Sequence, residues 1–277
     1  MRKVANRDGY GMPVLGQGTW MMGDDASRRA AEVAALRLGL DLGLTLIDTA
    51  EMYAGGGAEE IVAEGIAGRR DEVFVVSKVL PTNASYEGTL RASERSLARL
   101  RTDRIDLYLL HWPGRHPLEE TYRAFQHLRE AGKILHYGVS NFDLGEMTRS
   151  ESLPAGQGVG VNQVMYNLRR RGIERRLLPW SRQRQVTVMA YSPLDQAELH
   201  QSRALRASAD ERGCSPYRIA LAWTIREPGV TAIPKASSPD HVRDNAAAAG
   251  IELTADELAA LEREFPRPDR DIPLETS

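Results

Sequence analysis

Four side chains that can handle protons follow apolar runs in the first half of the chain. Asp48 ends the run LTLI, Lys78 ends VFVVS, and His111 follows IDLYLL, so these three lie about 30 residues apart, one strand–helix unit each. Tyr53 follows Asp48 on the loop or helical turn into which that run opens. If the runs are parallel strands, their carboxyl ends meet at one rim and bring the four side chains together.

A carboxylate, a phenol, an ammonium and an imidazole in one place suit proton transfer at a carbonyl or alcohol oxygen. A phenol with a pKa of about 10 is a poor acid at neutral pH, but a neighbouring ammonium favours the phenolate and lowers that pKa. A carboxylate beside the ammonium keeps it charged and aimed, and a neutral imidazole can donate a hydrogen bond to a carbonyl oxygen. Alone, each residue has a structural interpretation, such as a helix cap for Asp48. Four of them at matched positions favour a catalytic site.

Two other chemistries lack the residue patterns that they need. No cluster of histidine, cysteine and aspartate occurs at ligand spacing, so no metal site is predicted. No serine lies in a nucleophile-elbow motif, which argues against acyl transfer.

The later apolar runs end in side chains of a different kind. Three of them could hydrogen-bond a planar carboxamide, and they are Ser140, Asn141 and Gln163. Tyr191 could stack on a flat ring, and the loop from Ser192 to Leu194 offers backbone donors. Lys235 and Ser237 precede a helix expected to start near Pro239, and a lysine beside a helix N-terminus is an anion site. This half of the rim suggests a nicotinamide nucleotide.

The order of the elements is typical of an (β/α)8 TIM barrel. Apolar runs alternate with amphipathic stretches, and a short N-terminal β-hairpin is expected around Asp8-Gly9. After a short strand at GQGTW, strands are expected at 44–48, 73–78, 105–112, 134–141, 159–167, 186–193 and 230–235. Helices are expected near 27–43, 58–67, 85–100, 118–131, 143–150, 172–184, 201–212, 216–227, 239–248 and 255–264, which leaves extra helices toward the C-terminus. A doubly wound open sheet is the competing fold, but its GxGxxG fingerprint is absent.

Composition limits the classes of partner. The chain has 277 residues, 42% of them hydrophobic, and no linker divides it, so 1–277 is expected to form one domain. A net charge of −2 gives no reason to expect nucleic acid or an anionic membrane as a partner. No secretory signal and no apolar run of about 20 residues is seen, and the single Cys214 fits a reducing compartment. A cytoplasmic protein, either a monomer or a weak homo-oligomer, is expected.

The motifs GQGTW, LIDTAEMY, VVSKV, LLHWP, GVSNF, NQVMYN, YSPL and IPK occur in the order in which the aldo-keto reductase family has them. The resemblance runs from about residue 15 to 245 and implies reversible reduction of aldehydes and ketones to alcohols with NADPH. It matches the family's catalytic tetrad to Asp48, Tyr53, Lys78 and His111. The cofactor contacts that it implies are Ser140, Asn141, Gln163, Tyr191, Ser192, Leu194, Lys235 and Asn245. The residues themselves add Ser237 and His241 to the predicted cofactor site.

The chain departs from the family pattern at the adenosine end of the expected site. Ala236 stands where many members have serine, and His241 stands where an arginine usually grips the 2′-phosphate. Arg243 follows two residues later. We therefore expect NADH to be usable beside NADPH, with a modest preference for NADPH if Arg243 does not replace the missing arginine.

The C-terminal tail and the loop after His111 are short compared with longer family members. We therefore expect an open pocket that accepts varied small carbonyl substrates. Its expected lining is Trp20, Tyr53, His111 and Trp112. Two other functions use the same barrel: a nucleotide-binding regulatory subunit, as in potassium-channel β-subunits, and an enzyme in which Lys78 forms a Schiff base.

Overall fold

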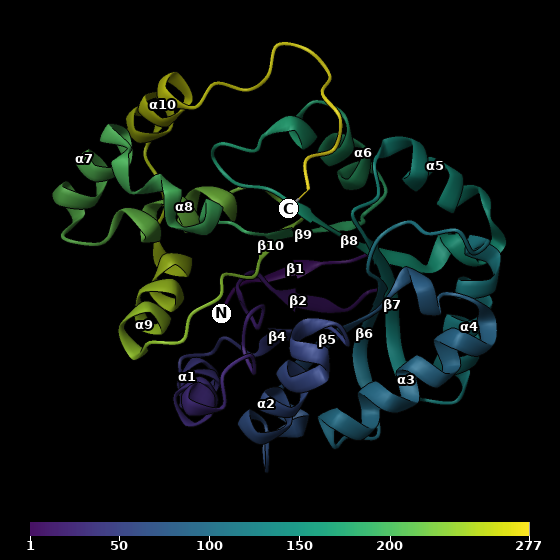
Figure 1. The fold of residues 1–277 in the computed structure, drawn as a ribbon. Coiled ribbons are helices and arrows are strands. Elements are labelled where there is room, and N and C mark those ends of the chain that lie inside the picture. Colours follow the sequence, from purple (N-terminus) through teal and green to yellow (C-terminus); the bar gives the residue numbers. More distant parts are fainter. Residues whose placement is uncertain (277) are drawn as a thin grey trace.

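A barrel of parallel strands forms the centre of the molecule (Figure 1). The computed structural model describes residues 1–276, apart from the side chain of His200. Within these residues one sheet runs in chain order, and bridges between Leu15 and Ala232 and between Gly18 and Lys235 join its two edges. Its strands are β3 (Gly16–Gly18), β4 (Leu46–Asp48), β5 (Phe74–Val79), β6 (Ile105–Leu110), β7 (Ile134–Ser140), β8 (Val159–Met165), β9 (Thr187–Tyr191) and β10 (Val230–Ala232).

Helices surround the barrel, as Figure 1 shows. Two of them, α7 and α8, lie between β9 and β10, and two more follow β10, so the expected extra C-terminal helices are present. None of the described helices combines the length and apolarity that crossing a bilayer requires. The helices are α1 (Arg29–Asp41), α2 (Gly57–Gly65), α3 (Tyr86–Leu100), α4 (Leu118–Glu130), α5 (Leu144–Ser152), α6 (Leu177–Gln183), α7 (Arg203–Arg212), α8 (Pro216–Thr224), α9 (Pro239–Ala247) and α10 (Ala255–Glu264).

The alternation of side chains along each strand divides the core into two regions. In β6 every residue is buried: Leu107 and Leu109 belong to the cluster inside the barrel, whereas Tyr108 and Leu110 pack against the helices. The interior cluster consists of Met12, Leu46, Val76, Leu107, Leu109, Val161, Met189 and Ile233. Because both faces of these strands are covered, their sequences are nearly continuous apolar runs.

The expected N-terminal hairpin is confirmed and reaches the interior of the barrel. β1 (Lys3–Ala5) pairs antiparallel with β2 (Gly11–Pro13). Met12 of this hairpin joins the interior cluster, and the Tyr10 ring stacks on His136 with 3.6 Å between ring centroids. The hairpin therefore fills the amino end of the barrel, opposite the strand ends that carry the candidate site residues.

Most predicted elements are present, and the differences lie at their ends. The strands predicted at 105–112 and 230–235 end earlier, at Leu110 and Ala232, so His111 and Lys235 belong to the loops that follow. The helix predicted at 172–184 forms only from Leu177, because a separate 3-10 turn occupies Gly172–Glu174. At the start of α10, Thr254 and Glu257 form a capping box.

Candidate active site

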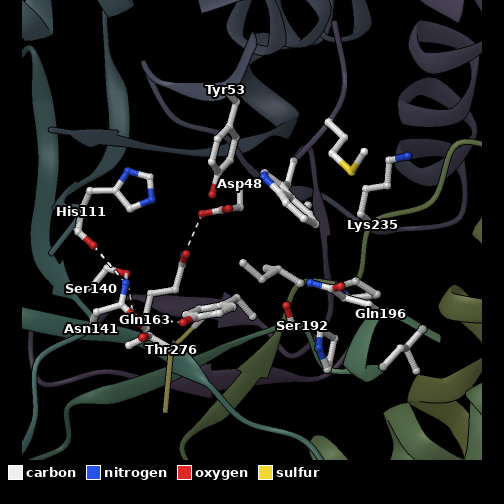
Figure 2. A pocket seen from close by; sticks show the side chains of 18 of the residues that line it. Asp48, Tyr53, His111, Ser140, Asn141, Gln163, Ser192, Gln196, Lys235 and Thr276 are labelled. Carbon is white, nitrogen blue, oxygen red and sulfur yellow. Dashed lines mark hydrogen bonds between the residues drawn. The ribbon is translucent and has the colours of Figure 1, made fainter. Parts of the chain in front are cut away.

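A cavity of about 1,200 Å³ opens at the carboxyl ends of the strands. Figure 2 shows Asp48, Tyr53 and His111 at one side of it and Lys235 at the other. Of the residues predicted from the sequence, Lys78 lies behind Asp48 and Tyr53, and Ser237 does not line the cavity. The others all line it: Trp20, Asp48, Tyr53, His111, Trp112, Ser140, Asn141, Gln163, Tyr191, Ser192, Leu194, Lys235, His241 and Asn245.

Lys78, the last residue but one of β5, is completely buried, and its ammonium makes three contacts. Its Nζ donates to Asp48 Oδ2 at 2.8 Å, to the Thr49 carbonyl at 2.9 Å and to the Tyr53 hydroxyl at 3.3 Å. Burial lowers the pKa of Lys78, but the charge of Asp48 and the contact with Tyr53 outweigh burial, so the net pKa is raised. The Lys78 ammonium is therefore a cation that three hydrogen bonds hold in place. A lysine buried after an apolar run needs such partners, because an unpaired buried charge is very unfavourable.

Tyr53 begins a short 3-10 helix, Tyr53–Gly56, that connects β4 to α2. Burial raises the pKa of its phenol, and the Lys78 ammonium opposes that rise without cancelling it. The sequence predicted a lowered pKa from the ammonium alone, because burial of the ring was not visible there. The phenol is consequently protonated at neutral pH, which is the form that donates a proton.

Asp48 connects the two halves of the rim. One carboxylate oxygen accepts from Lys78, and the other accepts from Gln163 Nε2 at 2.7 Å, a contact drawn in Figure 2. Burial raises the pKa of the Asp48 carboxyl, while Lys78 and Gln163 lower it. The sequence predicted a carboxamide contact for Gln163, and the structure adds a hydrogen bond to the tetrad that residue spacing did not reveal.

His111 presents a neutral imidazole to the cavity. Burial, together with the charge of Lys78, lowers its pKa to about 2. Its Nδ1 is buried and has no hydrogen-bond partner among residues 1–276, and its ring lies edge-on to Tyr53 with 5.8 Å between centroids. Trp112 follows at the mouth, with 4.8 Å between its ring centroid and that of His111. A neutral imidazole can serve as a hydrogen-bond donor to a carbonyl oxygen.

Asn141 organises the opposite wall. It adopts a left-handed backbone conformation with φ of 58°, which asparagine tolerates better than most residues. Its Nδ2 donates to the His111 carbonyl at 3.2 Å, and its Oδ1 accepts from the Tyr191 hydroxyl at 2.9 Å. Ser140 Oγ donates to the Gln163 carbonyl at 2.9 Å. These bonds hold polar groups of β7, β8 and β9 along one side of the cavity (Figure 2).

The far end of the cavity carries Lys235 and is more exposed. Lys235 follows β10, and its ammonium is 3.3 Å from Ser237 Oγ. His241, in the first turn of α9, also lines the cavity, whereas Arg243 does not and instead pairs with Asp240 at 3.3 Å. Ser238 caps α9, so the helix start adds a partial positive charge near Lys235.

The tail forms part of the wall, so the expected open pocket is wrong in this respect. Thr276 lines the cavity, and Figure 1 shows the tail returning over the barrel after α10. Glu275 pairs with Arg170 at 3.0 Å, and Asp271 pairs with Arg175 at 3.2 Å. These ion pairs hold the tail at the rim, and the sequence alone did not indicate which arginines would meet it.

Several other lining residues were not predicted. They come mainly from the loops at the mouth and from the start of α8, and they include Met21, Met52, Glu146, Gln196, Ala197 and Tyr217. Gln196 and Ala197 follow the predicted loop 192–194, so extending that loop by a few residues would have found them. Tyr217 carried no signal, because a single tyrosine at a helix start has no distinctive pattern.

The arrangement fits an elongated, phosphorylated ligand beside a small substrate. The volume exceeds the roughly 300–1,000 Å³ typical of single small-molecule sites. One end carries the proton-handling groups, the middle carries amide and hydroxyl groups, and the far end carries Lys235 beside the start of α9. This order of groups matches a nicotinamide, its ribose–phosphate link and a phosphate-bearing adenosine.

Comparison with known proteins agrees with the geometry. The model of the aldo/keto reductase family matches residues 14–264. A methylglyoxal reductase, YeaE from Escherichia coli (strain K12), is 51% identical over 93% of this chain and 92% of its own length. A glyoxal reductase from Bacillus subtilis (strain 168) is 32% identical over 96% of both chains. A crystal structure of an aldo/keto reductase from Klebsiella pneumoniae in complex with NADP and acetate is 48% identical and superimposes with a TM-score of 0.97 over 100% of both chains.

Proposed function

The chain belongs to the aldo/keto reductase family and is an NAD(P)H-dependent oxidoreductase, and we propose that it reduces small 2-oxoaldehydes such as methylglyoxal with Tyr53 as the proton donor. The observation that carries the proposal is the buried contact between the Tyr53 hydroxyl and the Lys78 ammonium at the wall of the cavity. The substrate class is supported by the relatives named for methylglyoxal and glyoxal.

The cofactor is NADPH, which when bound supplies a hydride to the carbonyl carbon. Tyr53 then donates its proton to the carbonyl oxygen. Lys78 stabilises the phenolate that remains, and Asp48 keeps the ammonium charged and directed at the phenol. His111 stays neutral and donates a hydrogen bond that orients the carbonyl oxygen.

The remaining wall would hold the cofactor. Ser140, Asn141 and Gln163 supply amide and hydroxyl groups where a nicotinamide carboxamide would lie. The ring of Tyr191 offers a stacking surface. Lys235 and the start of α9 would bind the phosphate at the adenosine end, and His241 would approach the same group.

The mouth of the cavity is apolar. Four of its lining side chains are large and remain more than a third exposed, and they are Trp20, Met21, Met52 and Trp112. Such a rim favours uncharged carbonyl compounds over carboxylated ones. A Schiff base on Lys78 fits less well, because its ammonium is fully buried and makes three hydrogen bonds.

The test is NADPH oxidation by the purified protein with methylglyoxal, an aromatic aldehyde, an aliphatic aldehyde and a 2-oxo acid. We expect turnover with the aldehydes, highest for methylglyoxal, and little with the 2-oxo acid. Tight NADPH binding without turnover on any aldehyde would contradict the proposal and favour a nucleotide-binding regulatory subunit. Turnover highest with the 2-oxo acid would contradict the substrate class.

A further inference from the structure

The turn after Tyr53 has an unusual backbone. Ala54, Gly55 and Gly56 all lie in the left-handed region, with φ values of 51°, 60° and 102°. This conformation is unfavourable for alanine, and such turns persist only where surrounding contacts hold them. The turn carries Tyr53 at its start and passes directly into α2, so whatever holds it also sets the position of the phenol.

The side chain of Arg99, from α3, lies against this turn. A Cβ atom at Gly56 would stand 2.5 Å from Arg99 Cδ and 2.6 Å from its Nε, so the absence of a side chain at Gly56 makes room for the guanidinium. Arg99 Nε then donates to Glu59 Oε2 at 2.6 Å. The arginine therefore packs on the turn and pairs with the first turn of α2 at the same time.

Glu59 extends this contact to the strand that carries Lys78. Its side chain is completely buried, and its Oε1 accepts from Ser77 Oγ at 2.6 Å. Ser77 directly precedes Lys78, and neighbouring side chains on a strand point to opposite faces. One carboxylate thus ties the segment after Tyr53 to the back of the strand that presents the ammonium.

A second, weaker attachment lies on the other side of Tyr53. Glu51 Oε1 accepts from the Leu80 backbone N–H at 2.8 Å and from Asn83 Nδ2 at 2.9 Å. Its other oxygen is 3.4 Å from a guanidinium nitrogen of Arg95. Arg95 and Arg99 are one helical turn apart, so one face of α3 meets carboxylates on both sides of Tyr53.

We propose that Glu59 and Arg99 are positioning residues that hold the Tyr53 hydroxyl against the Lys78 ammonium, with Glu51 and Arg95 as a second attachment. The inference rests on the proposed role of Tyr53 as proton donor. Neither Glu59 nor Arg99 lines the cavity, so their effect on the reaction passes through the geometry of the phenol. Loosening the turn separates the phenol from the ammonium, which slows proton donation and raises the pKa of Tyr53.

The first experiment uses the double variant Glu59→Gln/Arg99→Met, which removes both charges so that neither remains buried without a partner. We expect kcat to fall about 10- to 100-fold, the loss typical of a reacting group displaced by about 1 Å. The NADPH dissociation constant, measured by fluorescence titration, should stay within about threefold, because the cofactor wall is untouched. The alkaline limb of kcat against pH should move to higher pH. The single variant Arg99→Lys keeps both charges, so its kcat should lie much closer to wild type than that of the double variant.

A matched pair of glycine variants separates positioning from stability. Gly56→Ala places a methyl group against Arg99 in a left-handed conformation, whereas Gly68→Ala places one in open space at φ of 78°. Both should lower the melting temperature, because alanine is strained at positive φ. Only Gly56→Ala should lower kcat and shift its alkaline limb. This pair also decides the matter if the double variant fails to fold.

A wild-type kcat and a wild-type pH profile in Gly56→Ala would overturn the inference. So would a folded double variant in which only the melting temperature falls. In either case the Glu59–Arg99 pair would stabilise the fold without positioning Tyr53. The proposed function fails by a different result, near wild-type turnover in Tyr53→Phe. If both proposals hold, adding Glu59→Gln/Arg99→Met to Tyr53→Phe should lower kcat no further, because the phenol on which the pair acts is already gone.

Discussion

The two halves of the rim are built differently. On the side of β4 to β6, Asp48 and Lys78 are buried, and Lys78 uses all three ammonium protons in hydrogen bonds. On the side of β10 and α9, Lys235 and His241 are exposed, and within the described residues the Lys235 ammonium donates one side-chain hydrogen bond, to Ser237. Groups that must act on a transition state are fixed in advance, whereas groups that bind a charged ligand keep their solvent access. Substitutions in the first half should therefore change turnover and stability, and those in the second should change affinity.

Lys78→Met tests the first half with the largest expected effect on both turnover and stability. It leaves the Asp48 carboxylate buried without its cation, so the free energy of unfolding should fall by about 3–5 kcal/mol. Turnover should fall at least about 100-fold, because the phenolate loses its stabilising charge. Urea denaturation and NADPH oxidation measure the two effects. The double variant Asp48→Asn/Lys78→Met should regain stability but not turnover, and regained turnover would contradict a catalytic role for this pair.

Lys235→Met tests the second half. Loss of a charge-assisted contact of about 1.5–3 kcal/mol should weaken NADPH binding about 10- to 100-fold. NADH should be affected less, because it lacks the 2′-phosphate, and kcat at saturating cofactor should be unchanged. Fluorescence titration of both nucleotides provides the measurement. Equal weakening of NADPH and NADH binding, or a large loss in kcat, would contradict the proposed difference between the two halves of the rim.

His241→Arg also tests the second half of the rim, and we expect it to change nucleotide preference by a smaller factor. A guanidinium can form a bidentate contact with a phosphate, so the preference for NADPH over NADH should rise about tenfold. The matched control is Arg243→Gln, since Arg243 pairs with Asp240 and does not line the cavity. The control should leave the preference unchanged. A loss of preference in Arg243→Gln would instead show that Arg243 reaches the phosphate.

The smallest expected effect is that of pH on kcat. Reduction needs a protonated Tyr53, and burial raises its pKa above the usual value, so the acid form persists to at least about pH 9. His111, with a pKa of about 2, stays neutral over the same range. At saturating substrates kcat should therefore be flat from about pH 5 to about pH 9. An acidic limb near neutral pH would contradict this expectation. It would show that His111 titrates there, or that burial raises the pKa of Asp48 into that range.

The sequence predicted the barrel and the members of the site because both depend on local patterns. A buried strand reads as a continuous apolar run, and a titratable residue at or just after its carboxyl end lies near the rim, which located Asp48, Lys78 and His111 together. The assignment of roles to these residues remains a prediction that the variants above test.

The contacts between distant residues could not be predicted in the same way. Gln163 and Asp48 are separated by 115 positions, and nothing in their neighbours signals the hydrogen bond between them. The Arg99–Glu59 pair and the arginines that hold the tail look like ordinary surface charges in the sequence, because which charges meet is decided by the packing of helices and loops. The pKa of Tyr53 was likewise misjudged, since its burial depends on that packing.

The central claim is that the Tyr53 phenol donates the proton, and Tyr53→Phe tests it most directly because it removes one oxygen and keeps the ring. With methylglyoxal and saturating NADPH, kcat should fall about 10²- to 10⁴-fold. The NADPH dissociation constant should remain close to wild type. The melting temperature should fall by only a few degrees, because the Lys78 ammonium keeps its hydrogen bonds to Asp48 and Thr49. Turnover near the wild-type rate in this variant would contradict the account.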